Sequence, residues 1–230
     1  GILSSQSIKR GARVEYETES QDVSVRSRVT PGKVAVRAAE LRGIDPDSPD
    51  YESAVEAFTE SALESLTRLN KKEKEASGVA KKEMERAKTD REEHGEDATS
   101  VQTANMIWLS DEEIETLAQT IADSSDGAVV EPSDFIKEPG RTGSLSIAAF
   151  GRMFAMTKEL ETEAAIAVSP AEATHETVIE TDFFTTIDDN KVDTNDAAAG
   201  HLSQSNYTSG TFYRSVTIDR DQLKRSWTGF

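Results

Sequence analysis

The stretch ETVIETDFFTTIDD, residues 176–189, gives the strongest indication of the fold. Apolar and polar residues alternate along it, with Phe184 and Ile187 prominent, as is typical of a β-strand. Residues 190–210, NKVDTNDAAAGHLSQSNYTSG, are polar and rich in small side chains, so we expect a long loop there. The alternation returns in GTFYRSVTID, residues 210–219, which is predicted as a second strand. Together the three segments predict an extended β-hairpin with a long connection.

Helical patterns dominate the first half of the chain. Apolar residues recur at helical spacing over 51–69, and Ser110 begins a capping box before a helix over 112–123. Shorter helices are predicted over 8–17, after a hydroxyl-rich cap, and over 33–43, where a glycine ends the pattern. A helical segment followed by a hairpin predicts a mixed α+β protein.

The chain is acidic overall, but the acid is concentrated in one region. The 230 residues include 26 Lys and Arg against 43 Asp and Glu, a net charge of −17. Residues 44–135 hold nine basic and twenty-four acidic side chains, whereas residues 1–43 hold eight and five. Within the acidic region, residues 70–100 have almost no apolar side chains, which predicts a solvated helix or a partly disordered insertion. The net charge therefore does not exclude a local surface that binds anions.

Several classes of site are excluded by residue type. The sequence has no cysteine, so it can form no disulfide, thiolate metal site or cysteine nucleophile. It contains no apolar run of about 18 residues and no signal-peptide pattern, so we expect a cytoplasmic protein with no membrane partner. His175 and His201 lack metal-binding spacing, and Asp188-Asp189-Asn190 does not fit a calcium loop and is better explained by a turn with Asx caps. We therefore predict no enzyme activity, no metal and no cofactor.

The first thirteen residues, GILSSQSIKRGAR, form a candidate anion-binding segment. Hydroxyl and amide side chains precede the three basic residues Lys9, Arg10 and Arg13. Lys9 and Arg13 are four positions apart, so they share a face of the predicted helix. The start of a helix also offers free N–H groups and the positive end of the helix dipole, which favour phosphate. The alternative is a solvated basic helix with no ligand.

Exposed flat or apolar side chains would complete a surface for RNA, because RNA-binding proteins combine phosphate contacts with side chains that stack on bases. The candidates lie on the predicted hairpin and after a Gly-Arg pair; they are Phe183, Phe184, Leu202, Tyr207 and Met153. Taken singly, Phe184 and Met153 fit a hydrophobic core as well.

Four blocks occur in an order that resembles one known family. They are ILSSQSIKRGAR, IAAFGRM, ATHETVIETDFFTTIDD, and GHLSQSNYTSGTFYR followed by DRDQL. Together they resemble the backbone subunit that binds CRISPR RNA (crRNA) in the type I-E CRISPR Cascade complex, the CasC family. The middle of the chain matches this family only loosely, in its helical character and in WLSDEEIETLA.

The resemblance implies a palm related to the RNA-recognition motif (ferredoxin-like), with a helical finger insertion and a β-hairpin thumb. On this basis residues 1–43 and 136–230 form the palm, with the thumb at about 176–218, and residues 44–135 form the acidic finger. The family's first palm strand and its C-terminal part have no counterpart here, so we expect a fragment with an incomplete sheet.

The resemblance also implies a function without catalysis. Copies of the subunit line up along one crRNA, and each thumb folds over the guide and displaces a base, while the other bases pair with target DNA. The implied partners are crRNA, further copies of the chain, other Cascade subunits and target DNA. Two alternatives remain: a related endoribonuclease that uses His175 or His201 as a general base, and an acidic helical scaffold.

The family's contacts map onto matching positions of this sequence. Ser4, Gln6 and Lys9 match contacts to the crRNA backbone, and Arg10 and Arg13 extend the same basic face. The remaining matches are Met153, beside the displaced nucleotide, and the thumb residues Phe184, Thr185, Leu202 and His201.

Overall fold

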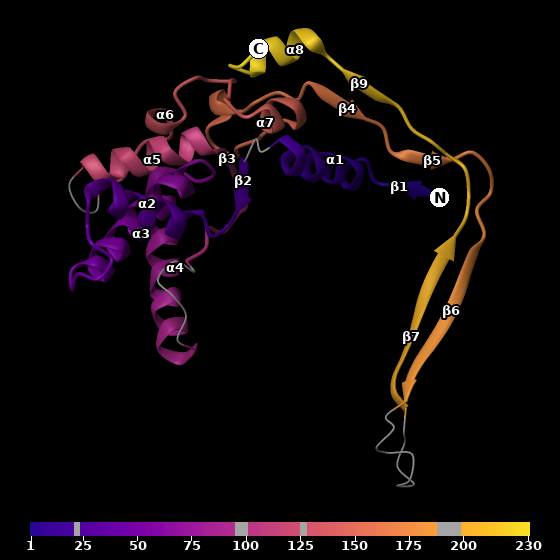
Figure 1. The fold of residues 1–230 in the computed structure, drawn as a ribbon, viewed down its shortest axis with the longest axis horizontal. Helices are drawn as coiled ribbons and strands as arrows, with labels where there is room; N and C mark the ends of the chain where they lie inside the picture. Colours follow the sequence, from indigo (N-terminus) through magenta and orange to yellow (C-terminus); the bar gives the residue numbers. More distant parts are fainter. Residues whose placement is uncertain (21–23, 95–100, 125–127, 188–198) are drawn as a thin grey trace. The chain divides into compact units, whose positions relative to one another are not determined.

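A computed structural model describes residues 1–20, 24–94, 101–124, 128–187 and 199–230. The chain divides into two compact units: residues 1–10 with 168–216, here the first unit, and residues 11–167 with 217–230, the second unit. Strands predominate in the first unit and helices in the second (Figure 1). The predicted mixed α+β class is therefore confirmed.

A small antiparallel sheet lies at the centre of the first unit. Its strands, in spatial order, are β1 (Ile2–Leu3), β5 (Ala171–Ala173) and β8 (Phe212–Tyr213). Two further backbone hydrogen bonds lengthen this ladder, from Ala173 N to the Gly1 carbonyl and from Thr174 N to the Thr211 carbonyl, at 2.8 and 2.9 Å. The sheet thus joins three segments that are far apart in the sequence.

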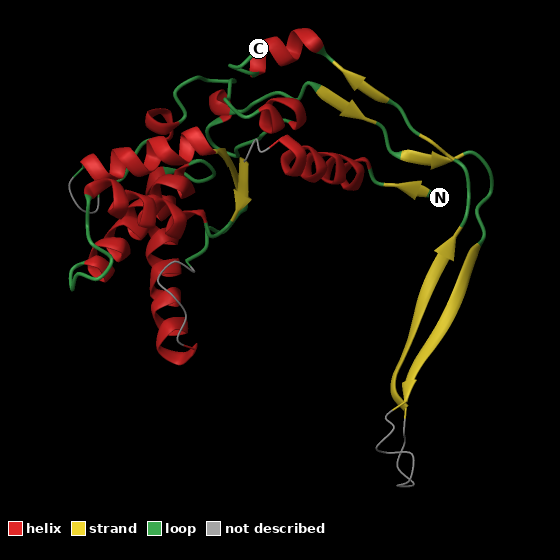
Figure 2. Ribbon diagram, viewed as in Figure 1, coloured by secondary structure: helices red, strands yellow, loops and turns green. Residues whose placement is uncertain are grey.

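The predicted β-hairpin is present, but its second strand lies elsewhere in the sequence. β6 (Ile179–Ile187) pairs antiparallel with β7 (Ala199–Thr208), and the two strands run side by side in Figure 2. The expected loop over 190–210 was therefore wrong for residues 199–208, which form β7, and its residues 190–198 lie outside the described part of the structure. The expected strand over 210–219 is divided between β8 and β9 (Val216–Ile218), and β9 pairs with β4 (Ile166–Val168).

Hydrogen bonding across the hairpin explains this difference. The sequence AGHLSQSNYT has no apolar alternation, yet β6 offers a continuous row of partners for its backbone groups. Strand formation depends on such cross-strand contacts more than on intrinsic preference. Between β8 and β9 the strand is interrupted at residues 214–215, where the Ser215 N–H donates to the Ser169 hydroxyl at 2.8 Å.

The second unit is built around three helices and a short strand pair. α2 (Thr30–Arg42) ends at Gly43, which adopts the left-handed conformation (φ 73°) that glycine tolerates. It packs on α3 (Tyr51–Arg68) and α5 (Asp111–Asp123), next to the pair of β2 (Ser24–Ser27) and β3 (Ile107–Ser110). The other helices are α1 (Ser5–Ser20), which begins in the first unit, α4 (Glu73–His94), α6 (Pro132–Phe135), α7 (Leu145–Phe150), α8 (Arg220–Ser226) and a 3₁₀ turn at Lys158–Leu160.

One hydrophobic core joins these elements. Val34 and Ala38 of α2 pack with Phe58 and Leu66 of α3 and with Leu117 of α5, and all five are almost completely buried. The helix α2 of the predicted palm and the helices α3 and α5 of the predicted finger therefore share this core. The predicted boundary at residues 43 and 44 itself stays a prediction.

Of the two predictions for residues 70–100, the solvated helix is confirmed by α4, which has one buried apolar stripe. Ala76, Ala80 and Met84, spaced four residues apart, are buried, and the last two pack with Leu63 and Val101. In the part of the chain that the structure describes, no helix combines the length and the apolar character needed to cross a membrane.

We expect Arg42→Ala to lower the free energy of unfolding by about 2 kcal/mol. The guanidinium donates to the carbonyls of Ala122 (2.9 Å) and Ser124 at the end of α5, and its Cζ lies 4.7 Å from the Phe58 ring centroid. Urea denaturation followed by circular dichroism measures the change.

The control for that measurement is Arg37→Ala on the same helix. Arg37 pairs at the surface with Glu115, at 2.7 Å, and this hydrogen bond holds the pKa of Glu115 below its usual value. Because water screens this exposed pair, the control variant should change stability much less. Equal losses in the two variants would contradict a capping role for Arg42.

Candidate nucleic-acid interface

The start of α1 carries the predicted phosphate-binding residues. β1 leads directly into Ser4, whose hydroxyl accepts a hydrogen bond from the Gln6 N–H at 3.3 Å and so caps the helix. No acidic side chain lies in the first turn of α1. Lys9 is partly exposed and Arg10 is exposed, and neither has a carboxylate partner among the residues described. The segment thus offers free N–H groups and two uncommitted cations.

Arg13 lies in a different environment. Its guanidinium pairs with Glu17 at 2.7 Å, and its Cζ stands 5.1 Å from the centroid of the Trp108 ring. The side chain is 14% exposed. Arg13 therefore helps to attach α1 to β3, whatever further contact it makes.

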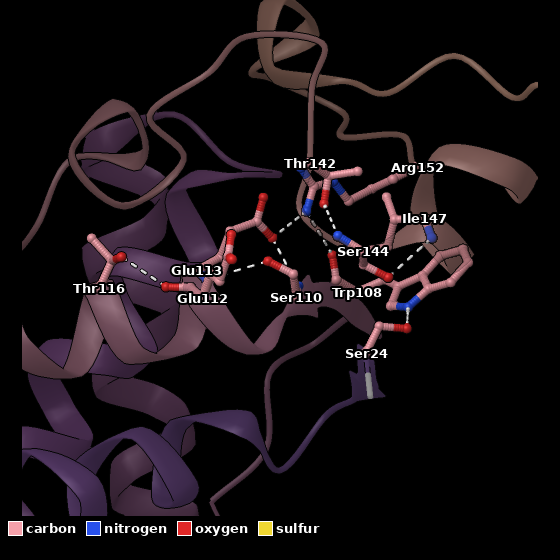
Figure 3. Close-up of polar contacts among 10 residues, drawn as sticks. All are labelled: Ser24, Trp108, Ser110, Glu112, Glu113, Thr116, Thr142, Ser144, Ile147 and Arg152. Carbon is pink, nitrogen blue, oxygen red and sulfur yellow. Dashed lines mark hydrogen bonds and ion pairs between the residues drawn. The ribbon is translucent and has the colours of Figure 1, made fainter. Parts of the chain in front are cut away.

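Glu17 connects this contact to two other elements of the second unit. One of its carboxylate oxygens accepts hydrogen bonds from the hydroxyls of Ser24 (2.7 Å) and Ser146 (2.8 Å). The Ser24 hydroxyl in turn accepts the indole N–H of Trp108 at 2.7 Å, as Figure 3 shows. Sequence reasoning missed Glu17, because only its i, i+4 spacing from Arg13 is visible in the sequence.

The hairpin presents aromatic side chains on both of its faces. Phe183 and Phe184 are adjacent in β6, so they point to opposite faces, and they are 67% and 45% exposed. Tyr207 of β7, opposite Glu180 in the register, shares the face of Phe184 and is 59% exposed. None of the three contributes to a core in this chain.

The two faces differ in charge. Glu180 and Asp182 share the face of Phe184 and Tyr207, whereas Thr181, Gln204 and Asn206 share the face of Phe183. Thr181 donates a hydrogen bond to the Asn206 amide oxygen at 2.9 Å. The face of Phe183 thus carries no charge among the residues described in β6 and β7.

The other thumb positions are defined by their backbone only. The register places Thr185 opposite Leu202 and Thr186 opposite His201. The side chains of Thr185, His201 and Leu202 lie outside the described part of the structure, as does the whole of the segment Asp188–Asn190 for which a turn was predicted.

Met153 is held in an exposed position by its neighbours. Gly151 before it has φ 80°, and a β-carbon there would lie 2.9 Å from the Ala164 β-carbon. Arg152 and Phe154 on either side are buried, while Met153 is 82% exposed. A long apolar side chain presented in this way is suited to contact a base, and its position in a core is excluded within this chain.

A shallow depression adjoins Met153. Its volume is about 550 Å³, and it is lined by Phe150, Gly151, Arg152, Met153, Glu161, Thr162 and Glu163. Two carboxylates border it, and the only cation, Arg152, is buried. Such a lining disfavours phosphate and is compatible with an uncharged base.

The candidate general bases are His175 and His201, and the side chain of His201 lies outside the described part of the structure. His175 is exposed, and its ring Nδ1 lies 3.4 Å from the neighbouring Thr174 hydroxyl. No group of three or more His, Asp or Glu side chains is placed to hold a metal in the described ranges. The predicted absence of enzyme activity stays a prediction.

The predicted site residues divide between the two units. Ser4, Gln6, Lys9, Arg10 and the thumb positions belong to the first, and Arg13 and Met153 belong to the second. Within the first unit, β1 precedes α1, β5 precedes β6, and β8 follows β7. One small sheet therefore carries both the start of the basic helix and the aromatic hairpin.

The fold of this chain is similar to that of chains in two solved structures. One chain of a "CRISPR RNA-guided surveillance complex, pre-nicking" is 26% identical, with a TM-score of 0.66 over 96% of this chain and 56% of that chain. A chain of a "CRISPR RNA-guided surveillance complex" is 21% identical, with a TM-score of 0.55 over 96% and 54%, and it supports the fold alone. The present chain thus spans about half the length of both.

A family model also matches the chain, whereas no curated protein does. The family model described as "CT1975-like protein" matches residues 2–230, almost the whole sequence. This agrees with the resemblance to Cascade backbone subunits that the four sequence blocks carry. The chain belongs to the family of CT1975-like proteins.

Proposed function

We propose that this chain is a crRNA-binding subunit of a CRISPR surveillance complex. The family match and the similarity to a chain of such a complex support association with crRNA and with other subunits. The finer parts of the proposal are that the protein is not catalytic, that it forms a row of copies along the guide, and that bases between the contacts pair with target DNA.

The observation that carries the proposal is the placement of two kinds of group on one sheet. The strand β1 leads to Ser4, Gln6, Lys9 and Arg10, which offer donors and positive charge without a competing carboxylate. The strands β5 and β8 lead to and from a hairpin with exposed aromatic rings. Phosphate contacts fix the position of a strand, and stacking side chains hold or displace its bases.

The acidic character of the rest of the chain is consistent with this function. The acidic excess belongs to the region 44–135, and most of it lies outside α4, where seven acidic and six basic residues nearly balance. The acid therefore lies apart in the sequence from the basic start of α1. The scaffold alternative predicts no RNA binding at any salt concentration, and the endoribonuclease alternative predicts shortened RNA.

Lys9→Ala is expected to weaken crRNA binding and to reduce the slope of log K against log salt concentration by about one unit. Each phosphate contact displaces counterions from the RNA when the protein binds. A variant with one contact fewer therefore releases fewer counterions, and its affinity depends less steeply on salt concentration. Fluorescence anisotropy with a labelled crRNA at several salt concentrations measures the slope.

Lys33→Ala is the matched control, because Lys33 is an exposed lysine on α2 and the substitution removes the same charge. The control should keep the wild-type slope. If Lys9→Ala also keeps the wild-type slope and affinity, Lys9 is not a phosphate contact.

A further inference from the structure

Arg152 is a buried cation whose hydrogen bonds are incomplete. Its side chain is 1% exposed, and Nη1 donates to Glu113 Oε2 at 2.5 Å and to the Trp108 carbonyl at 3.3 Å (Figure 3). Among the described residues Nε and Nη2 have no hydrogen-bond partner, and Cζ lies 4.9 Å from the Phe154 ring centroid. An apolar side chain at such a position often serves folding equally well, so stability alone does not account for the pair.

Glu113 is fixed independently of Arg152. It is the third residue of α5, and the same oxygen, Oε2, accepts the Ser110 N–H at 2.9 Å. The Ser110 hydroxyl accepts the Glu113 N–H at 3.3 Å, which completes a capping box. The carboxylate therefore belongs to the rigid start of a helix, and the ion pair attaches residue 152 to that helix.

The attachment determines where Met153 points. The backbone of Arg152 exchanges two hydrogen bonds with Thr162, at 2.8 and 2.9 Å, so this short stretch is extended. In an extended chain alternate side chains face opposite ways. Because Arg152 and Phe154 face inward, Met153 faces outward and lies at the rim of the depression.

We infer that Glu113 and Arg152 form a positioning pair, which holds Met153 ready to contact an RNA base. This inference rests on the proposed function. Arg152 itself is too buried to touch the RNA, and Glu161 and Glu163 on the rim disfavour a phosphate there. The group that Met153 meets is therefore an uncharged base of a single strand.

A double-mutant cycle tests the inference with the full chain and a labelled crRNA. The first change is Met153→Ala. The second is the pair Arg152→Met with Glu113→Gln, which removes both charges, while glutamine can still complete the capping box. The third variant combines all three substitutions. Affinity for crRNA is measured for each, with thermal unfolding as a separate measurement.

Met153→Ala is expected to weaken binding about tenfold, near the lower end of the range for removal of an aromatic side chain that stacks on a base. The charge-removing pair should weaken it by a similar factor, although its unfolding temperature stays close to that of the wild type. The triple variant should bind no more weakly than either, because the pair acts through Met153. Independent effects would instead multiply, to about a hundredfold.

If the wild type binds crRNA but the triple variant loses affinity by the product of the two separate losses, the inference is wrong and the proposed function stands. Failure of the wild type to bind crRNA would overturn the proposed function and the inference together. If the charge-removing pair does not fold, Arg152→Lys takes its place, because lysine keeps the charge beside Glu113. This variant should bind crRNA about as tightly as the wild type, and a loss of binding of about tenfold in it would count against the inference.

Discussion

Arg152→Ala is expected to lower the free energy of unfolding by about 3–5 kcal/mol, because it leaves the Glu113 carboxylate buried without its cation. Glu113 and Arg152 side chains are 8% and 1% exposed, so water cannot replace the lost partner at full strength. The variant also loses the contact of the guanidinium with the Phe154 ring. Urea denaturation followed by circular dichroism gives the change.

Two comparisons make this result specific. Arg141→Ala breaks an ion pair with Glu138, at 3.0 Å, that is exposed, and should cost at most about 1 kcal/mol. Arg152→Met with Glu113→Gln removes both buried charges and should cost much less than Arg152→Ala. A loss below about 1 kcal/mol for Arg152→Ala would contradict the strength of the buried pair.

Phe184→Ala is expected to weaken crRNA binding by about 1–3 kcal/mol, while the dependence on salt concentration stays close to that of the wild type. The ring is exposed on the hairpin and makes no core contact, so its removal should not change folding. Anisotropy titrations at several salt concentrations separate the two quantities. A slope that falls as far as in Lys9→Ala would contradict a stacking role.

Tyr213→Ala provides the matched control, since Tyr213 is also an exposed aromatic residue of the first unit but lies in β8, outside the hairpin. Its binding should match the wild type. Phe183→Ala then shows whether the second face of the hairpin takes part, because the two rings differ in the charge of the surrounding face. Loss of binding in Phe183→Ala but not in Phe184→Ala would transfer the stacking role to the uncharged face.

Local sequence patterns predicted the helices well. The capping box at Ser110, the glycine that ends α2 and the apolar spacing of α3 each depend on residues within a few positions of one another. Such features are determined by local backbone hydrogen bonds and by one buried face. The first hairpin strand was predicted from the alternation in its own sequence, although neither face of its described side chains is buried.

The second hairpin strand could not be predicted from its own composition. AGHLSQSNYT is small and polar, and β6 alone supplies the hydrogen-bonding partners that make it a strand. The roles of Arg13 and Arg152 were hidden for a related reason. Trp108 lies far from Arg13 in the sequence, and Glu113 is 39 positions from Arg152, so neither contact leaves a local pattern.

Titration of a labelled single-stranded crRNA with the wild-type chain at increasing salt concentration tests the central claim most directly, with the RNA recovered afterwards on a denaturing gel. The account predicts binding that is tight at low salt and weakens steadily as salt rises, with the recovered RNA intact. Absence of binding at the lowest salt concentration, or recovery of shortened RNA, would contradict it.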